Sequence, residues 1–264
     1  MSEDGPAPVD ETYEQALARA ASIYPGLKVG RPGRSRLYRP TKALLHLVRV
    51  RIAIDVAGVS NVDDSRPAII VGNHLSVLDP VVGVVRSPWH VAAFTKVEAY
   101  ESAGGFFFRL MGQIPLRRGD EASTEWGLDM AHRMLESGGK VAIYPEGTRG
   151  PDRGAVYRLH QRLLVPLLEQ NPGVPVHAIA TTYPPGGRLR SRAVVRLSPP
   201  LPVDARSMTG PEMTAVIRDA LVELTGLRYV DRYAVVDKRR AAQGLPLEPD
   251  GRSEPGAAEP GATA

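Results

Sequence analysis

The 264-residue sequence contains no cysteine. A catalytic thiol is therefore excluded, and the composition fits a reducing compartment. Aromatic residues make up only 6% of the chain. They are not interleaved with the basic residues, and the chain shows no recognised nucleic-acid-binding module, so we expect no nucleic acid among its partners.

The sequence also lacks a long apolar run. A helix that crosses a bilayer needs about 18 or more consecutive apolar residues. The most apolar candidate, residues 44–59, is interrupted by Arg49, Arg51 and Asp55. The first six residues are acidic and contain proline, which is not typical of a secretory signal. The chain is predicted not to span a membrane.

Positive charge is in slight excess, with a formal net charge of +4, and it is concentrated near the N-terminal side. On a helix over residues 40–50, Lys42, His46 and Arg49 would share one face, with Leu44, Leu47 and Val48 opposite. Such an amphipathic segment suits an anionic leaflet, although a helix packed on the domain fits the short pattern equally well. We expect a cytoplasmic protein, peripheral on the inner face of the membrane.

Apolar strands alternate with helical segments along much of the chain. This alternation predicts an α/β single domain with a largely parallel or mixed central sheet flanked by helices, and the 43% hydrophobic content can fill its core. The expected organisation is an N-terminal helix and basic linker over 1–38, the α/β domain over 39–237 and a disordered tail over 238–264. Residues 155–170 are predicted to form a helix.

A histidine follows the first strongly apolar strand. The run 68–71 reads as a buried strand, His74 stands just beyond its end, and Asp79 lies five residues further, near the start of a helix. A carboxylate on one imidazole nitrogen fixes the tautomer and leaves the other nitrogen as a base. The chain has six histidines, and the spacing alone fits a buried histidine and a helix-capping aspartate equally well.

Two later strands also end in polar side chains. Residues 112–118 end in Arg117 and Arg118, and residues 141–149 break at a proline before Glu146 and Arg149. Open α/β sheets bind their ligands at the carboxyl ends of their strands. These distant segments are therefore predicted to assemble one site.

The three segments together resemble the glycerophospholipid acyltransferases, whose best-known members acylate lysophosphatidic acid. The run 73–79, NHLSVLD, matches the first motif of that family, 112–118 matches the second and 145–149, PEGTR, matches the third. Residues 174–179 approximate the fourth, and the resemblance covers about residues 50–200. The family often has serine after the third motif, where this chain has Gly150.

The resemblance implies transfer of a fatty acyl group from an acyl-CoA or acyl carrier protein thioester to the free hydroxyl of 1-acyl-sn-glycerol-3-phosphate. His74 would be the general base, held by Asp79, and neither a cofactor nor a metal ion is expected. Ser76 is expected to serve the turn rather than act as a nucleophile. The residues expected to hold the phosphate head group are Arg118, Glu146, Gly147, Thr148 and Arg149, with support from Asn73, Ser76 and Gly112.

Glu146, beside two arginines, is expected to stay ionised. Two alternatives remain open from the residues. The acceptor alcohol could be another lysophospholipid, a glycolipid or a specialised metabolite, as the departure at Gly150 suggests. The chain could also be a non-catalytic membrane-binding protein of the same fold.

Overall fold

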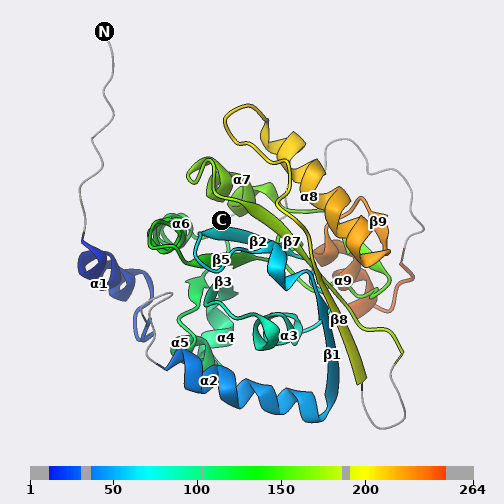
Figure 1. The fold of residues 1–264 in the computed structure, drawn as a ribbon, viewed down its shortest axis with the longest axis horizontal. Helices are drawn as coiled ribbons and strands as arrows, with labels where there is room; N and C mark the ends of the chain where they lie inside the picture. Colours follow the sequence, from blue (N-terminus) through cyan, green and yellow to red (C-terminus); the bar gives the residue numbers. More distant parts are fainter. Residues whose placement is uncertain (1–11, 31–36, 103, 186–190, 248–264) are drawn as a thin grey trace.

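The computed structural model describes residues 12–30, 37–102, 104–185 and 191–247 (Figure 1). Its centre is a seven-stranded sheet with the order β1-β8-β7-β2-β5-β3-β4. All neighbouring strands are parallel except β7 and β8, which are antiparallel. The predicted α/β class with a largely parallel or mixed sheet is confirmed. The strands of this sheet are β1 (Ile52–Ala57), β2 (Ala68–Gly72), β3 (Val91–Lys96), β4 (Ile114–Leu116), β5 (Lys140–Ile143), β7 (Val176–Thr182) and β8 (Ser191–Leu197).

Helices cover both faces of the sheet (Figure 1). One face packs against α6, α7 and α8, and the other against α2 and α3. The helices are α1 (Tyr13–Ile23), α2 (Tyr38–Leu45), α3 (Asp79–Arg86), α4 (Val97–Glu101), α5 (Gly105–Leu110), α6 (Glu121–Glu136), α7 (Gln161–Glu169), α8 (Gly210–Thr225) and α9 (Ala234–Ala242), with short 3-10 turns at His46–Val50 and Val59–Asn61.

Strand β2 shows why the sheet must be covered on both sides. All five of its residues are buried. Ile69 and Val71 belong to the core under α6 and α7, whereas Ala68 and Ile70 belong to the core under α3. Successive strand side chains point to opposite faces, so an uninterrupted apolar run requires two apolar layers.

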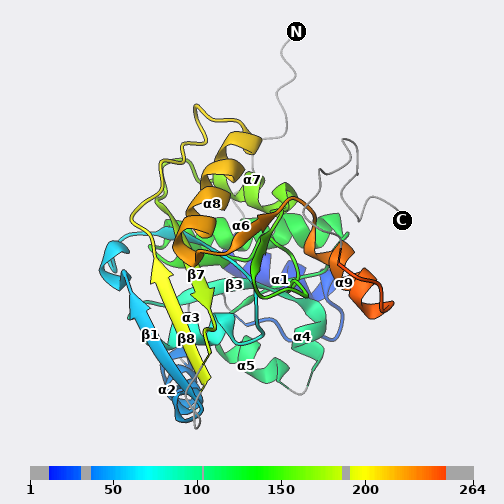
Figure 2. The ribbon, with the colours of Figure 1, turned by 90° about the vertical axis from the view of Figure 1, so that its right-hand side faces the viewer.

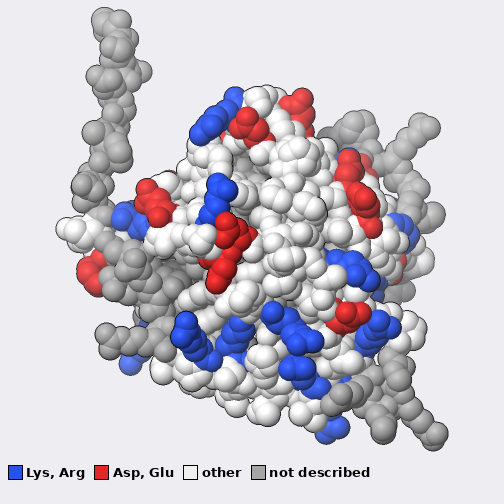
Figure 3. Space-filling model, viewed as in Figure 1, with Lys and Arg blue, Asp and Glu red and all other residues white. Residues whose placement is uncertain are grey.

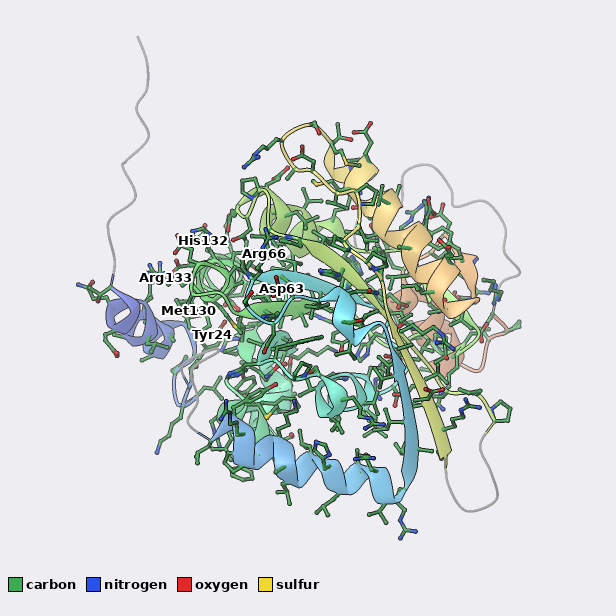
Figure 4. All side chains as sticks on the ribbon, viewed as in Figure 1. Tyr24, Asp63, Arg66, Met130, His132 and Arg133 are labelled. Carbon is green, nitrogen blue, oxygen red and sulfur yellow. The ribbon has the colours of Figure 1, made fainter. Side chains whose placement is uncertain are left out.

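Helix α1 is integrated into the domain rather than extending from it. Ala16 and Tyr24 are buried in the main core. The Tyr24 hydroxyl donates to the carbonyl of Pro115 at 2.9 Å, and the Trp126 indole donates to the Ala16 carbonyl at 2.7 Å. Figure 4 shows Tyr24 close to α6. The described part of the predicted region 1–38 therefore contributes to the core of the domain.

The segment after α2 differs from its predicted pattern. Leu45 and Val48 pack toward the core beneath α3, so the prediction that Val48 shares a face with Leu44 and Leu47 is wrong. Leu44 and Leu47 are 49% and 64% exposed, and Val50 is 60% exposed. The 3-10 turn over His46–Val50 changes the helical period, which explains why the apolar side chains redistribute.

The prediction of one helix over 155–170 is wrong. Residues 155–157 form strand β6 (Ala155–Tyr157), and α7 begins only at Gln161. Strand β6 pairs in parallel with β9 (Arg228–Val230), a partner about 70 residues away that local periodicity cannot reveal. The apolar side chains of this pair and of α9 form a small core of their own, which contains Ala155, Tyr157, Val230 and Ala234.

Helix α9 also corrects the predicted tail. Residues 238–242, which were expected to be disordered, complete α9, and residues 248–264 lie outside the described residues. β9 and α9 lie at the right of Figure 1 and on the viewer's side in Figure 2. Within the described residues, no helix has the length and apolarity that a membrane crossing requires.

Candidate active site

The predicted site residues lie at one edge of the sheet. Strands β2, β5 and β7 run in the same direction and are adjacent, so the residues that follow them meet. His74 follows β2, Glu146 follows β5, and Tyr183 follows β7. Arg118 comes after β4, which runs parallel to β3 at the end of the same sheet.

His74 and Asp79 form the predicted pair. The Nδ1 atom of His74 lies 3.0 Å from Oδ2 of Asp79, which is fully buried, whereas His74 is 21% exposed. A carboxylate can only accept, so Nδ1 carries the proton and Nε2 is the basic nitrogen. The site therefore presents a partly exposed base fixed by a buried anion.

The Asp79 carboxylate is held by several donors besides His74. The backbone N–H groups of Leu75 and Ser76 donate to its Oδ2 at 2.7 Å each, and the Tyr183 hydroxyl donates to its Oδ1 at 2.6 Å. Burial and the nearby Asp79 charge raise the pKa of Tyr183, so its hydroxyl stays protonated and donates. Sequence reasoning missed Tyr183, although it directly follows a strand that ends at the site.

Glu146 ties the first and third motifs together. Its Oε1 accepts the backbone N–H of His74 at 2.7 Å, and its Oε2 accepts the backbone N–H of Tyr157 at 3.2 Å. Burial raises its pKa to about 8, against the opposing effect of these two hydrogen bonds. The expectation that two arginines keep Glu146 ionised is wrong. The carboxyl group is fully buried and bonds to the backbone on both sides of the site.

Of the three supporting residues, Asn73 and Ser76 shape the backbone next to the base, whereas Gly112 lies before β4. The Asn73 side chain makes two hydrogen bonds to the backbone of Thr181 in β7. It accepts from the N–H at 2.7 Å and donates to the carbonyl at 2.9 Å. The Ser76 hydroxyl accepts the Leu78 N–H at 3.2 Å, which is the turn role predicted for it. Gly112 has a φ of +61°, a conformation that favours glycine where α5 turns toward β4.

The third motif and Arg118 come together at Gly147, whose φ is +70°. A methyl group at Gly147 would lie 3.0 Å from Cδ2 of His160 and 3.8 Å from Nη2 of Arg118. Glycine is therefore required by both the backbone and the space. Thr148 is buried, and its Oγ1 lies 3.5 Å from Nζ of Lys238 on α9. Sequence reasoning included neither His160 nor Lys238 in the site.

Gly150 has a packing explanation. A methyl group at this position would come within 2.2 Å of the Tyr157 ring. Tyr157 is fully buried in the small core formed with β9 and α9. The departure from the serine that the family often has here therefore makes room for an aromatic ring.

Several cations surround the predicted phosphate position. Burial lowers the pKa of Lys96, and the charges of Arg118, Lys238 and Arg149 lower it further, while Glu98 opposes them. Arg117 has a different role from Arg118, because its guanidinium donates to the carbonyl of Ile23 at 2.8 Å and to Asp120 at 3.3 Å. Of the predicted arginine pair, Arg117 therefore holds neighbouring segments together, and Arg118 lies near the Gly147 turn.

This geometry can be compared with known proteins. The acyltransferase family model matches residues 53–179, from β1 into β7. The matched residues make up just under half of the chain and include the motifs by which the sequence resembles the glycerophospholipid acyltransferases. Tyr183 and Lys238 lie beyond the matched residues.

The chain is similar to a plant enzyme in sequence and to a bacterial protein of known structure in fold. A chloroplastic 1-acyl-sn-glycerol-3-phosphate acyltransferase of Arabidopsis thaliana is 31% identical over 108 residues, which cover 38% of this chain and 28% of the relative. The chain thus spans less than a third of the length of that relative. The crystal structure of the 1-acyl-sn-glycerophosphate acyltransferase PlsC from Thermotoga maritima is similar in fold, with a TM-score of 0.52 and 23% identity over 71% of this chain and 78% of that one.

Replacing Tyr183 with phenylalanine removes one donor from the Asp79 carboxylate. A hydrogen bond to a charged group contributes about 1.5–3 kcal/mol. Because this bond orients the base and not the substrate, we expect kcat for acyl transfer to fall about tenfold, the lower end of that range, with little change in the acceptor KM. Steady-state kinetics measure kcat and KM separately. An effect on KM alone would contradict a role of Tyr183 in orienting the base.

The raised pKa of Glu146 has a defined effect on stability. Between about pH 4.5 and pH 8 the folded protein keeps a proton that the unfolded chain loses, so the free energy of unfolding falls as pH rises. Glu146→Gln removes this titration and leaves a backbone N–H without its acceptor.

The stability advantage of the wild type over Glu146→Gln should therefore be largest near pH 4.5 and narrow toward pH 8. Urea unfolding of both proteins across this range measures the difference, in which the other titrating groups cancel. An advantage that widens as pH rises would show that the native state favours the ionised carboxylate.

Proposed function

We propose that the protein transfers a fatty acyl group from a thioester, on coenzyme A or acyl carrier protein, to the free hydroxyl of lysophosphatidic acid. The observation that carries the proposal is the His74–Asp79 pair at the same sheet edge as the Gly147 turn, with the Arg118 guanidinium beside that turn. A base and a cationic group close to one turn are what a phosphate-bearing alcohol substrate requires. The match to the acyltransferase family model and the activities for which the Arabidopsis and Thermotoga proteins are named support the same reaction.

The chemistry follows from the state of His74. Its Nε2 accepts the proton of the acceptor hydroxyl, and the oxygen attacks the thioester carbonyl carbon. The tetrahedral intermediate then collapses, the carbon–sulfur bond breaks, and the leaving sulfur takes the proton back from Nε2. Asp79 stabilises the imidazolium in between, and Glu146 fixes the backbone that carries the imidazole.

The phosphate of the acceptor would lie between the cations at the sheet edge. Arg118 approaches the Gly147 turn. Arg149, two residues after Gly147, is exposed. A guanidinium forms paired hydrogen bonds to phosphate oxygens and stays charged at all relevant pH values. Thr148 adds a hydroxyl at the same turn.

A small apolar pocket of about 40 Å³ next to the base has room only for the first carbons of the acyl chain. It lies between α3 and the sheet and is lined mainly by apolar groups, among them Gly83, Ala142, Tyr144 and Ile179. The Tyr144 ring centroid lies 5.1 Å from that of His74, so the pocket begins beside the imidazole. Gly83 leaves space there, because a methyl group on it would lie 3.2 Å from Cδ1 of Ile179.

Acyl transfer from a labelled long-chain acyl-CoA, and in parallel from acyl carrier protein, to lysophosphatidic acid tests the proposal. We expect product with the wild type and a loss of about 10²- to 10⁴-fold in His74→Ala, because the general base is deleted. His132→Ala, on α6 with its Nδ1 2.9 Å from Asn171, is the matched control and should keep the wild-type rate.

A second assay measures acyl transfer to monoacylglycerol, which is the same acceptor without the phosphate. The wild type should use it poorly, and equal turnover on both acceptors would contradict the roles of Arg118 and Arg149. Wild-type rates in His74→Ala would overturn the mechanism. No product with either donor would overturn the proposed function.

We also propose that the protein binds the anionic inner face of the membrane through α2 and the turn that follows it. Leu44, Leu47 and Val50 form an exposed apolar row at intervals of three residues. Arg39 and Arg49 are exposed on the same segment. Figure 3 shows a band of basic side chains across the lower part of this face, toward α2 in the same view of Figure 1. Apolar burial and attraction to anionic lipids would act together there.

Vesicle sedimentation measures this binding. The wild type should bind phosphatidylglycerol vesicles more strongly than phosphatidylcholine vesicles, and less strongly as salt rises. The double variant Leu44→Ser with Leu47→Ser should bind at least about tenfold more weakly, because two apolar side chains no longer enter the lipid. Leu245→Ser, at a residue 46% exposed near the end of the described chain, is the control. Equal binding by all three proteins would contradict the proposal.

A further inference from the structure

The C-terminal segment is built onto the third motif. The backbone N–H of Arg158 donates to the carbonyl of Arg232 at 3.0 Å, next to the β6–β9 pair. The His160 ring stacks on the Tyr233 ring with centroids 4.1 Å apart and planes inclined by 8°. His160 is the residue that faces Gly147 across the turn. The segment 228–242 is therefore in contact with the loop that carries Thr148 and Arg149.

A buried ion pair sets the position of α9. The guanidinium of Arg232 makes two parallel hydrogen bonds to the Asp237 carboxylate, at 3.1 Å each. Asp237 is 1% exposed and Arg232 has a side chain 14% exposed. A bidentate pair in this setting restricts orientation as well as distance. Asp237 precedes Lys238, so the pair determines where the lysine side chain projects.

Lys238 reaches the third motif from this fixed position. Its Nζ lies 3.5 Å from the Oγ1 of buried Thr148. Together with Arg118 and Arg149, it is near enough to act electrostatically on Lys96. These positive charges lower the pKa of Lys96, and the carboxylate of Glu98 raises it. Four cations around one acidic side chain repel each other, and an anion bound among them would relieve that repulsion.

We infer that Lys238 is a phosphate-binding residue that α9 adds to the site from outside the segment matched by the family model. This inference rests on the proposed function and deepens it, because it adds a ligand to the phosphate position. Its ammonium would contribute a point charge and hydrogen-bond donors in addition to the guanidinium of Arg118. The phosphate chemistry is shared by the acceptor head group and by the phosphates of coenzyme A.

Binding measurements on the full-length protein test the inference without acyl transfer. Isothermal titration with glycerol 3-phosphate reports the acceptor phosphate, and titration with coenzyme A reports the donor phosphates. Lys238→Gln should raise the Kd of at least one of these probes about tenfold. Lys238→Arg, which keeps the charge, should restore most of the affinity. Arg239→Gln, the same loss of charge on the next and exposed residue of α9, should leave both affinities unchanged.

The two probes decide the source of the phosphate. A loss confined to glycerol 3-phosphate places Lys238 on the acceptor, and a loss confined to coenzyme A places it on the donor. Unchanged affinity of Lys238→Gln for both probes, or equal losses in Lys238→Gln and Arg239→Gln, would overturn the inference. Matching unfolding midpoints for the two glutamine variants are expected, since both side chains are exposed.

The phosphate-binding measurement and the acyl-transfer assay can succeed or fail independently of each other. A protein that transfers no acyl group but loses phosphate affinity in Lys238→Gln would keep the inference and reject the reaction. A protein that forms phosphatidic acid with unchanged phosphate affinity in Lys238→Gln would keep the reaction and reject the inference.

Discussion

The buried carboxyl group of Glu146 connects the parts of the site. It accepts the backbone N–H of His74 from the first motif and that of Tyr157 from β6. An unpaired N–H at either position would cost about 1–3 kcal/mol, so this group stabilises the placement of the two backbone segments relative to each other. The positions of the imidazole and of β6 both depend on it.

A second buried carboxyl group, that of Asp79, organises the side chain of the base in the same way. It accepts from the imidazole, from two backbone N–H groups and from Tyr183. The histidine is thus fixed at its backbone by Glu146 and at its ring by Asp79. Because the imidazole is already oriented, no free energy is needed to reorient it when a hydroxyl binds. This preorganisation lowers the activation free energy relative to the reaction in water.

How far the sequence predicts this molecule depends on the range of the interactions involved. The strand before His74 and the mixed sheet were predictable, because apolar runs and turn residues are local signals. The pair of His74 and Asp79 was predictable for the same reason. Strand β6, the role of Glu146 and the contacts of Tyr183 and Lys238 depend on partners far away in the chain. No local pattern contains those partners.

The parallel pairing of β6 with β9 has a consequence for the order in which the protein is made. Residues 155–157 leave the ribosome long before residues 228–230, to which they bond. Closing a loop of about 70 residues must wait for the later strand, and domains form as their last required segments emerge. The third-motif loop, which β6 adjoins, therefore acquires this support only after residues 228–230 have been synthesised. A nascent chain that already contains all four motifs would still lack a completed site.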